Sequence, residues 1–249
     1  MKIVSPESMV AAIREVGIIP FFKGPVPGFS VEEMTPPEHW FDSSEELGPW
    51  DWKIAAVQSG DIAYGKFLCG GKAAFATVEW YAHLHNWKLS QARFEPDAAG
   101  RKVLELMEKQ GSVGSKDIRQ LLGLKKAAAD GVVTRLSHCT RLLIGDIQRV
   151  YRGPTLKYSG WQTCSFCTPE ALFGSDVIGS GDSGTAGSVF GGPGAPRTAA
   201  PFFGGFSPFS AEDPLEVGCT PAESFDALLA HLRELLPEAR EKDIRKLLE

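Results

Sequence analysis

Residues 115–138 read SKDIRQLLGLKKAAADGVVTRLSH, and this stretch decides the expected fold. Ser115 is expected to cap a short helix that ends at Gly123, because serine favours helix starts and glycine commonly follows helix ends. A longer helix is expected from about Lys125 to Ser137, since apolar residues recur there at helical spacing: Ala128, Val132, Val133 and Leu136. Two helices joined by a tight glycine turn are typical of a helix-turn-helix.

The neighbouring segments extend this pattern on both sides. A helix is expected over 98–110, and two strands are expected over 141–147 and 161–167. Between the strands lies the polar and basic stretch 148–158, which is expected to form a loop. Helix, short helix, turn, helix, strand, basic loop and strand is the element order of a winged helix-turn-helix. The expected fold class is therefore α+β.

Residues 1–97 are expected to form a helix-and-hairpin module that packs on the winged helix. Helices are expected over 6–16, after Thr35, over 50–59 and over 79–87. The turn Gly70-Gly71 separates two strand-like stretches, 62–68 and 72–77, which predicts a hairpin. Most of the tryptophans lie in this module and are expected to supply its core: Trp40, Trp50, Trp52, Trp80 and Trp87.

The rest of the chain has two further parts. Residues 174–214 contain ten glycines and five prolines, so they are expected to form a linker without a core of its own. Residues 215–249 are expected to form amphipathic helices that are broken at Pro237. The predicted division of the chain is thus 1–97, 98–173, 174–214 and 215–249. The apolar stripe of the last part must be buried on the body of the protein or on another chain.

Composition excludes several classes of protein. A hydrophobic fraction of 43% argues against wholesale disorder, and no apolar run is long enough for a transmembrane helix. The first fifteen residues lack the apolar centre of a secretory signal. Five widely spaced cysteines argue against a disulfide framework. We therefore expect a cytoplasmic protein that has no membrane partner.

Charge is distributed unevenly along the chain. Residues 98–160 carry 12 basic and 5 acidic side chains, a net charge of +7, although the whole chain has a net charge of −5. A basic segment of this kind favours binding to polyanions through counterion release. The alternative is a solvated helix face whose lysines pair with acidic residues elsewhere in the protein.

Six basic residues of this segment are the expected contacts to double-stranded DNA. Lys125, Lys126 and Arg135 belong to the expected recognition helix, where basic side chains can reach phosphates and base edges. Arg149, Arg152 and Lys157 belong to the expected wing, where they would meet the DNA backbone or the minor groove. Winged helices also serve as protein-interaction modules or in transcriptional regulators, and this alternative stays open.

Four sequence segments carry a family resemblance: Pro49-Trp50-Asp51-Trp52-Lys53, Ala63-Tyr64-Gly65-Lys66-Phe67, Glu79-Trp80, and residues 158–174. Over about residues 5–174 the chain resembles the AlkZ-related family of bacterial winged-helix proteins, distant relatives of AlkZ-type alkylpurine DNA glycosylases. The resemblance implies a winged-helix DNA-binding fold and a role connected with damaged DNA. It does not carry over catalysis, because the Gln-x-Gln or Gln-x-Asp type motif of the AlkZ-type enzymes is missing, and a DNA glycosylase-like activity stays an open alternative.

Two carboxylates are the candidates for a catalytic role, Asp51 and Glu79. Both lie among the tryptophans, and a partly buried carboxylate can activate water. The alternative is structural: Asp51 caps a helix, and Glu79 pairs with Lys66 or Lys72. The sequence leaves open whether the protein is an enzyme.

No cofactor or metal site is expected. Cys164 and Cys167 lie three residues apart on an expected strand, so they would face opposite sides. His83 and His85 would diverge on a helix. The apolar stripe over 221–248 leads to one more prediction, which is self-association through the C-terminal helices.

Overall fold

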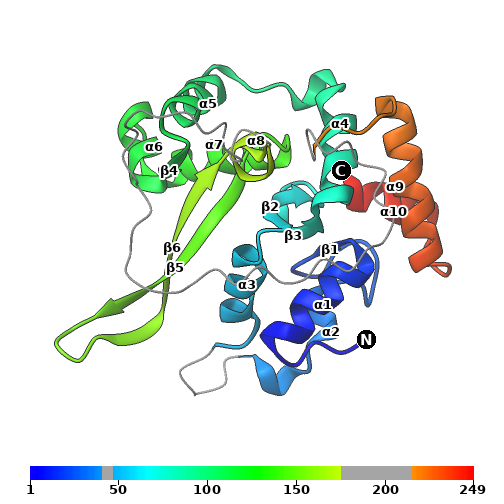
Figure 1. Cartoon of the computed structure of the whole chain (residues 1–249), viewed down its shortest axis with the longest axis horizontal. Helices are drawn as coiled ribbons and strands as arrows, with labels where there is room; N and C mark the ends of the chain where they lie inside the picture. The colour runs from blue at the N-terminus through cyan, green and yellow to red at the C-terminus, as the bar shows by residue number, and fades with distance from the viewer. Residues whose placement is uncertain (41–46, 175–214) are drawn as a thin grey trace, which may run out of the picture.

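The computed structural model describes residues 1–40, 47–174 and 215–249 (Figure 1). Within these residues the chain forms a mixed α+β fold with ten α-helices and two three-stranded antiparallel sheets, which confirms the expected class. The expected linker lies outside the described residues except for Gly174. None of the described helices is long and apolar enough to span a bilayer.

The N-terminal module contains the first sheet, in the order β1-β3-β2. Its elements are α1 (Pro6–Val16), β1 (Ile18–Pro20), α2 (Val31–Met34), the 3-10 turn η1 (Pro37–His39), α3 (Pro49–Gln58), β2 (Ile62–Leu68), β3 (Lys72–Thr77), α4 (Val78–Leu89) and the 3-10 turn η2 (Ala92–Phe94). The expected hairpin and three of the four expected helices are confirmed. Of the helix expected after Thr35, the described residues contain only the short 3-10 helix η1, and residues 41–46 lie outside the described part of the chain.

Strand β1 was not expected from the sequence. Ile19 lies opposite Phe75 in β3, and Pro20 ends the strand. Because β1 is an edge strand, proline, which has no N–H, is tolerated at this position. Strand β2 is buried along nearly its whole length, with only Lys66 exposed. A strand that is covered on both faces is a continuous apolar run, so its sequence lacks strict alternation.

The second unit is built around the second sheet, in the order β4-β6-β5. Its elements are α5 (Ala98–Gln110), β4 (Ser112–Gly114), α6 (Ser115–Leu122), α7 (Lys126–His138), β5 (Leu143–Arg152), β6 (Lys157–Cys167) and α8 (Pro169–Phe173). The three expected helices and two expected strands are confirmed. Two details differ: the cap of α6 is Gly114 rather than Ser115, and most of the stretch 148–158 is strand rather than loop.

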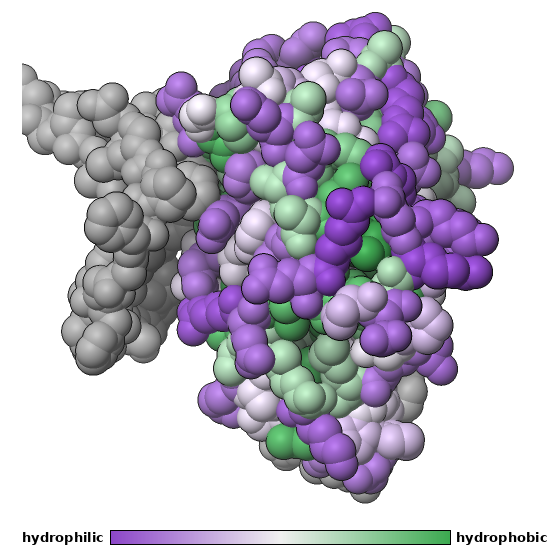
Figure 2. Space-filling model, turned by 90° about the vertical axis from the view of Figure 1, so that its right-hand side faces the viewer, coloured by the Kyte–Doolittle hydropathy of each residue, from purple (hydrophilic) through white to green (hydrophobic). Residues whose placement is uncertain are grey.

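The C-terminal part forms α9 (Pro221–Leu235) and α10 (Glu241–Leu248), which pack against α4 and β2 (Figure 1). Their apolar stripe is buried within the chain, and Phe225 stacks on Trp87 with a centroid distance of 4.5 Å. The outer surface on this side is mainly hydrophilic, with hydrophobic residues in small separate patches (Figure 2). The stripe is thus covered by the body of the protein, and self-association through it stays a prediction.

Two apolar clusters hold the described residues together. One combines the N-terminal module with α9 and α10, and the other lies between α5, α6, α7 and the second sheet. Ile144 and Cys164 contact both clusters. At Gly65 the backbone of β2 lies directly against α7: the Lys66 N–H donates to Ser137 Oγ at 2.6 Å, and a Cβ at Gly65 would be 2.7 Å from that oxygen. The two units are therefore in tight contact.

The expectation that the tryptophans fill the core holds only in part. Trp52 and Trp87 are buried, but Trp40, Trp50 and Trp80 are partly exposed at the edge of the first cluster.

Candidate nucleic-acid interface

The hairpin of β5 and β6 projects from the body of the molecule (Figure 1). Exposure alternates along β6, because the outer half of this strand has only one covered face. Lys157, Ser159, Trp161 and Thr163 are exposed, whereas the residues between them are half-buried. At the turn between the strands, Leu156 is 69% exposed. The outer half of the hairpin is therefore an open surface.

Gly160 determines the shape of this surface. It has a φ of +81°, a conformation that favours glycine, and it lies where the pairing of the two strands is irregular, between Arg149 and Tyr151. A Cβ at this position would lie 2.5 Å from Leu47 Cδ1. The residue that follows, Trp161, is 59% exposed.

Cationic and aromatic side chains share the outer face of the hairpin. Arg152 lies opposite Lys157 in the ladder, so both side chains point to the same face. The Arg152 guanidinium lies 5.1 Å from the centre of the Trp161 ring, within the range of a cation–π contact. No ion pair is recorded for Arg152 or Lys157 with any other residue that the structure describes.

The inner face of the hairpin is fixed to the N-terminal module through Asp51. The Asp51 carboxylate accepts hydrogen bonds from the Tyr158 hydroxyl at 2.6 Å, from Gln162 Nε2 at 2.9 Å and from the Leu47 N–H at 2.7 Å. Arg149 Nε lies 3.4 Å from the same carboxylate. The Asp51 side chain is only 1% exposed. Asp51 thus joins helix α3 to both strands of the hairpin.

This anchor also changes the acidity of its neighbours. Burial, and then the hydrogen bond to Asp51, raise the pKa of the Tyr158 hydroxyl. Burial disfavours the charged form of Arg149, but the adjacent Asp51 carboxylate favours it, and the net effect is a raised pKa. Arg149 therefore stays charged beside Asp51, and the guanidinium also lies 5.1 Å from the Tyr158 ring centre.

Helix α7 presents a second surface. Its N-terminal part is exposed and combines two lysines with two small side chains: Lys125, Lys126, Ala127 and Ala128. Lys126 Nζ lies 2.7 Å from Asp130 Oδ2 one turn later. Arg135 Nη2 lies 3.0 Å from Asp97 Oδ2, just before helix α5. Two of the three expected basic residues are thus paired with acids, as the alternative interpretation of the charge requires.

The fold adds one cation that sequence reasoning missed. Lys66 is exposed on β2, and its Nζ donates to Thr134 Oγ1 on α7 at 3.1 Å. Lys66 belongs to the acidic first part of the chain, so a count of charge along the sequence assigns it elsewhere. Sequence reasoning also missed Trp161 as a surface residue. Its position four residues after Lys157 in β6 is a usable signal, because residues separated by an even number of positions share one face of a strand.

Comparison with known proteins agrees with the resemblance seen in the sequence. A family model described as AlkZ related matches residues 3–188. The chain belongs to the AlkZ-related family. No curated protein matched the chain, and no solved structure matched it either. The region matched by the AlkZ-related model includes α7, the hairpin and Asp51, and it ends before the C-terminal helices.

In this AlkZ-related chain the two candidate carboxylates occupy different environments. Asp51 is buried at the start of α3, whereas Glu79 is exposed in the first turn of α4. No described contact joins them, and the described ion pairs do not include one from Glu79 to Lys66 or Lys72. Among the described residues, no group of three His, Cys, Asp or Glu side chains could hold a metal ion.

The six expected DNA contacts of the AlkZ-related chain fall into two sets. Lys126 and Arg135 lie on α7 and Lys125 is its N-cap, whereas Arg149, Arg152 and Lys157 lie on the hairpin. Within the hairpin the roles differ. Arg149 points to the inner face and Asp51, whereas Arg152 and Lys157 point outward.

Proposed function

We propose that this protein binds double-stranded DNA and has a role related to DNA repair, with residues 98–167 acting as a winged helix. In this proposal α7 is the recognition helix and the β5–β6 hairpin is the wing. The order of α5, β4, α6, α7, β5 and β6 supports it, as does the three-stranded antiparallel sheet. Membership of the AlkZ-related family supports the connection with repair.

The observation that carries the proposal is the outer face of the hairpin. Arg152 and Lys157 offer two cations without a recorded ion pair among the described residues, beside the exposed ring of Trp161. Cations of this kind release counterions from DNA when they contact phosphates. Exposed aromatic and aliphatic side chains next to them can contact sugars or bases. If the outer face of the hairpin had no binding role, it would not need three exposed large apolar side chains, which are those of Trp161, Tyr151 and Leu156.

Helix α7 supports the proposal in a second way. Ala127 and Ala128 are exposed beside Lys125 and Lys126, so the N-terminal part of the helix can approach a groove closely. Alanine can contact the thymine methyl group, and lysine can reach guanine edges or phosphates. The pairing of Lys126 with Asp130 reduces the contribution of this lysine to binding.

The proposal includes no catalytic step. An excision enzyme needs a carboxylate or amide that reaches the substrate and positions water. Asp51 is buried and accepts hydrogen bonds from Tyr158, Gln162 and Leu47, so its geometry supports an anchoring role. Glu79 lies on a different helix, with an exposed side chain.

The test is a fluorescence anisotropy titration with a short labelled duplex at about 50 mM and about 200 mM salt. The double variant Arg152→Ala/Lys157→Ala should bind about 10-fold more weakly, and its salt slope should fall by about 2. The matched control is Lys2→Ala/Lys242→Ala, which removes two exposed lysines outside the second unit. Absence of binding at low salt, or equal weakening by both double variants, would reject the proposal.

The repair relationship needs a separate comparison. Titrations with an intact duplex and with duplexes that carry an alkylated base or an abasic analogue should show tighter binding to a damaged duplex. A damaged site is easier to deform, so a protein that inserts side chains at a kink gains affinity there. Equal affinities for all duplexes would leave general DNA binding and remove the connection with repair.

A further inference from the structure

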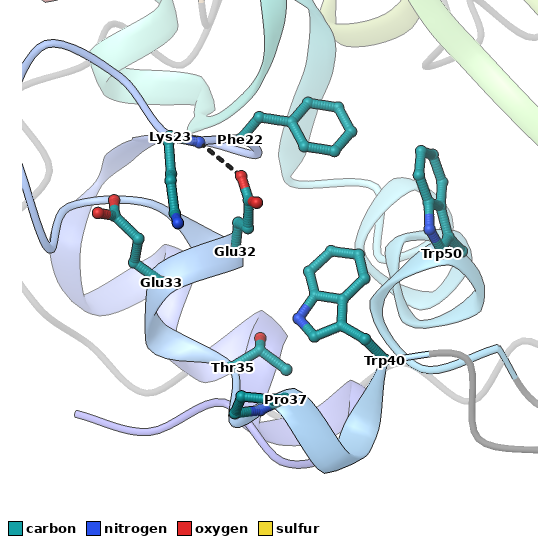
Figure 3. A pocket seen from close by; sticks show the side chains of 8 residues that line it. All are labelled: Phe22, Lys23, Glu32, Glu33, Thr35, Pro37, Trp40 and Trp50. Atoms are coloured by element: carbon teal, nitrogen blue, oxygen red, sulfur yellow. Dashed lines mark hydrogen bonds between the residues drawn. The ribbon is translucent and has the colours of Figure 1, made fainter.

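A pocket of about 630 Å³ opens on the N-terminal module (Figure 3). It is distinct from the proposed DNA interface, because none of its lining residues lies on α7 or on the hairpin. Side chains from α2, η1, α3 and the segment after β1 line it: Phe22, Lys23, Glu32, Glu33, Thr35, Pro37, Trp40 and Trp50.

Aromatic rings form one side of the pocket (Figure 3). The centroids of Phe22 and Trp50 lie 5.6 Å apart, and those of Trp40 and Trp50 lie 6.3 Å apart in an edge-to-face arrangement. Phe21 lies behind these rings and is fully buried. Its ring centroid lies 6.0 Å from that of Trp40 and 5.6 Å from that of Trp50. Contacts with a buried ring hold the pocket rings in place without any bound molecule.

Carboxylates form the opposite side, together with Lys23 (Figure 3). Glu32 Oε2 accepts a hydrogen bond from the Lys23 N–H at 2.9 Å, and Glu33 Oε2 accepts one from the Ser30 hydroxyl at 2.7 Å. Each bond uses one oxygen, and the structure records no partner for the other oxygen among the described residues. Two carboxylates and one lysine ammonium give the pocket a formal charge of −1.

Trp50 already takes part in one cation–π contact within the chain. Lys53 does not line the pocket, and its ammonium lies 4.8 Å from the Trp50 ring centre. Lys53 is buried, and burial lowers the pKa of its ammonium. The Trp50 ring thus already contacts one ammonium group, whose charged form burial disfavours.

We propose that this pocket binds a methylated ammonium group. The faces of aromatic rings attract cations, and methyl groups give such a cation an apolar surface that suits three rings. Carboxylates supply the countercharge without needing a hydrogen-bond donor from the ligand. A small inorganic cation would instead require several oxygen ligands, and a neutral apolar ligand would leave the net charge of −1 uncompensated.

The same chemistry is found in free quaternary amines and in trimethylated lysine side chains. Isothermal titration calorimetry on the full chain with choline, and separately with a trimethyl-lysine peptide, distinguishes the two sources. The control ligand is 3,3-dimethyl-1-butanol, which has the shape of choline without its charge. At least one cation should bind about 10-fold more tightly than this neutral alcohol.

Three variants connect binding to the pocket. Glu32→Gln keeps an oxygen that can accept from the Lys23 N–H but loses the charge, and Trp40→Leu removes a ring; each should weaken cation binding about 10-fold. Glu38→Gln is the matched control, because Glu38 is exposed next to the pocket without lining it, and it should bind like the parent.

The proposal is overturned if neither cation binds, if the neutral alcohol binds equally well, or if Glu32→Gln and Glu38→Gln behave alike. If Trp40→Leu fails to fold, Glu32→Gln still tests the proposal. The DNA titration of the same variants is an independent measurement, so either proposal can fail alone.

Discussion

The two sheets of this protein have the same number of strands and the same antiparallel pairing, but their hairpins lie in opposite environments. Both are three-stranded and antiparallel, and each contains a hairpin. In the first sheet β2 is buried along almost its whole length, whereas β6 alternates between exposed and half-buried residues until its last two residues, far from the turn, enter the core. The first sheet is thus a scaffold, and the outer half of the second is a surface. The same local structure serves either purpose, and the difference lies in what covers it.

The largest effect is expected in the buried sheet. Phe75 in β3 is fully buried, and its ring stacks on Tyr64 at 4.5 Å. Phe75→Ala should lower the free energy of unfolding by about 3–5 kcal/mol, because it leaves a cavity that the packed neighbours cannot fill. Chemical denaturation measures this loss.

The matched variant in the exposed sheet is Trp161→Ala. Although it removes a larger ring, it should cost less than about 1 kcal/mol, because Trp161 is 59% exposed. Equal losses in the two variants would mean that the outer half of the hairpin is not an open surface.

Lys88 is expected to make the stability of the folded chain depend on pH. It is fully buried, and its ammonium donates to the carbonyl oxygens of Phe67 at 2.8 Å and of His138 at 3.0 Å. Burial lowers the pKa of Lys88 to about 7, although Cys139, Cys69 and Glu249 favour its charged form.

Between about pH 7 and pH 10 the unfolded chain therefore binds more protons than the folded chain. The free energy of unfolding should rise with pH in this window, by up to about 1.4 kcal/mol per pH unit. Denaturation at several pH values from 7 to about 8.5 is compared between the parent and Lys88→Met, because both contain the same cysteines and the titration of unfolded thiols near pH 8.5 contributes to both curves. Lys88→Met should flatten the curve, and an unchanged slope in this variant would contradict the assignment to Lys88.

Asp51 connects the scaffold to the surface. Asp51→Asn removes the charge that faces Arg149 and replaces an acceptor of the Tyr158 and Gln162 hydrogen bonds. We expect a loss of about 2–3 kcal/mol, since one part-buried donor then faces an amide N–H and the partly buried Arg149 cation loses its countercharge.

Hydrogen exchange of the hairpin amides should show where this loss acts. Faster exchange in β5 and β6 than in β2 and β3 is the expected result, because Asp51 fixes the hairpin rather than the first sheet. Uniform acceleration throughout the protein would indicate general destabilisation instead of a lost anchor.

A smaller effect than at Asp51 is expected at Gly160. Its φ of +81° disfavours any residue with a Cβ, and Leu47 lies in the way of the added methyl group. Gly160→Ala should cost about 1–2 kcal/mol. Gly153→Ala is the control in the hairpin turn, where φ is also positive but no atom lies within 4 Å of an added Cβ, so it should cost less. Thermal unfolding of both variants tests whether the contact with Leu47 matters.

Much of the fold could be predicted because the relevant signals are local. Helix α1 and the hairpin of β2 and β3 were predicted from caps, apolar spacing and the Gly70-Gly71 turn, and the structure confirms their bounds. Strand β1 could not be predicted, because three apolar residues become a strand only when Ile19 finds Phe75 across the ladder. The extension of β5 and β6 through the basic stretch was missed for a similar reason: charged residues in a hairpin are stabilised by the pairing of strands and not by their own propensity.

For the candidate site, the sequence indicated the residue types but not their roles. Arg149 and Arg152 look equivalent in the sequence, yet one is paired with Asp51 and the other lies over Trp161. Asp51 was considered for catalysis, and its contacts with the hairpin appear only when residues about one hundred positions apart meet. The pocket of Trp40, Trp50 and Glu32 was not expected at all, because tryptophans were assigned to the core.

The sequence by itself determined most of the helices and the hairpin of β2 and β3, and it concentrated positive charge in residues 98–160. Tertiary structure alone decided which strand faces are covered, where the C-terminal stripe is buried, and which cations have an acidic partner. The physical reason is the distance along the sequence over which each interaction acts. Capping, turn geometry and periodicity act over a few residues, whereas burial and ion pairing depend on groups that are brought together from distant parts of the chain.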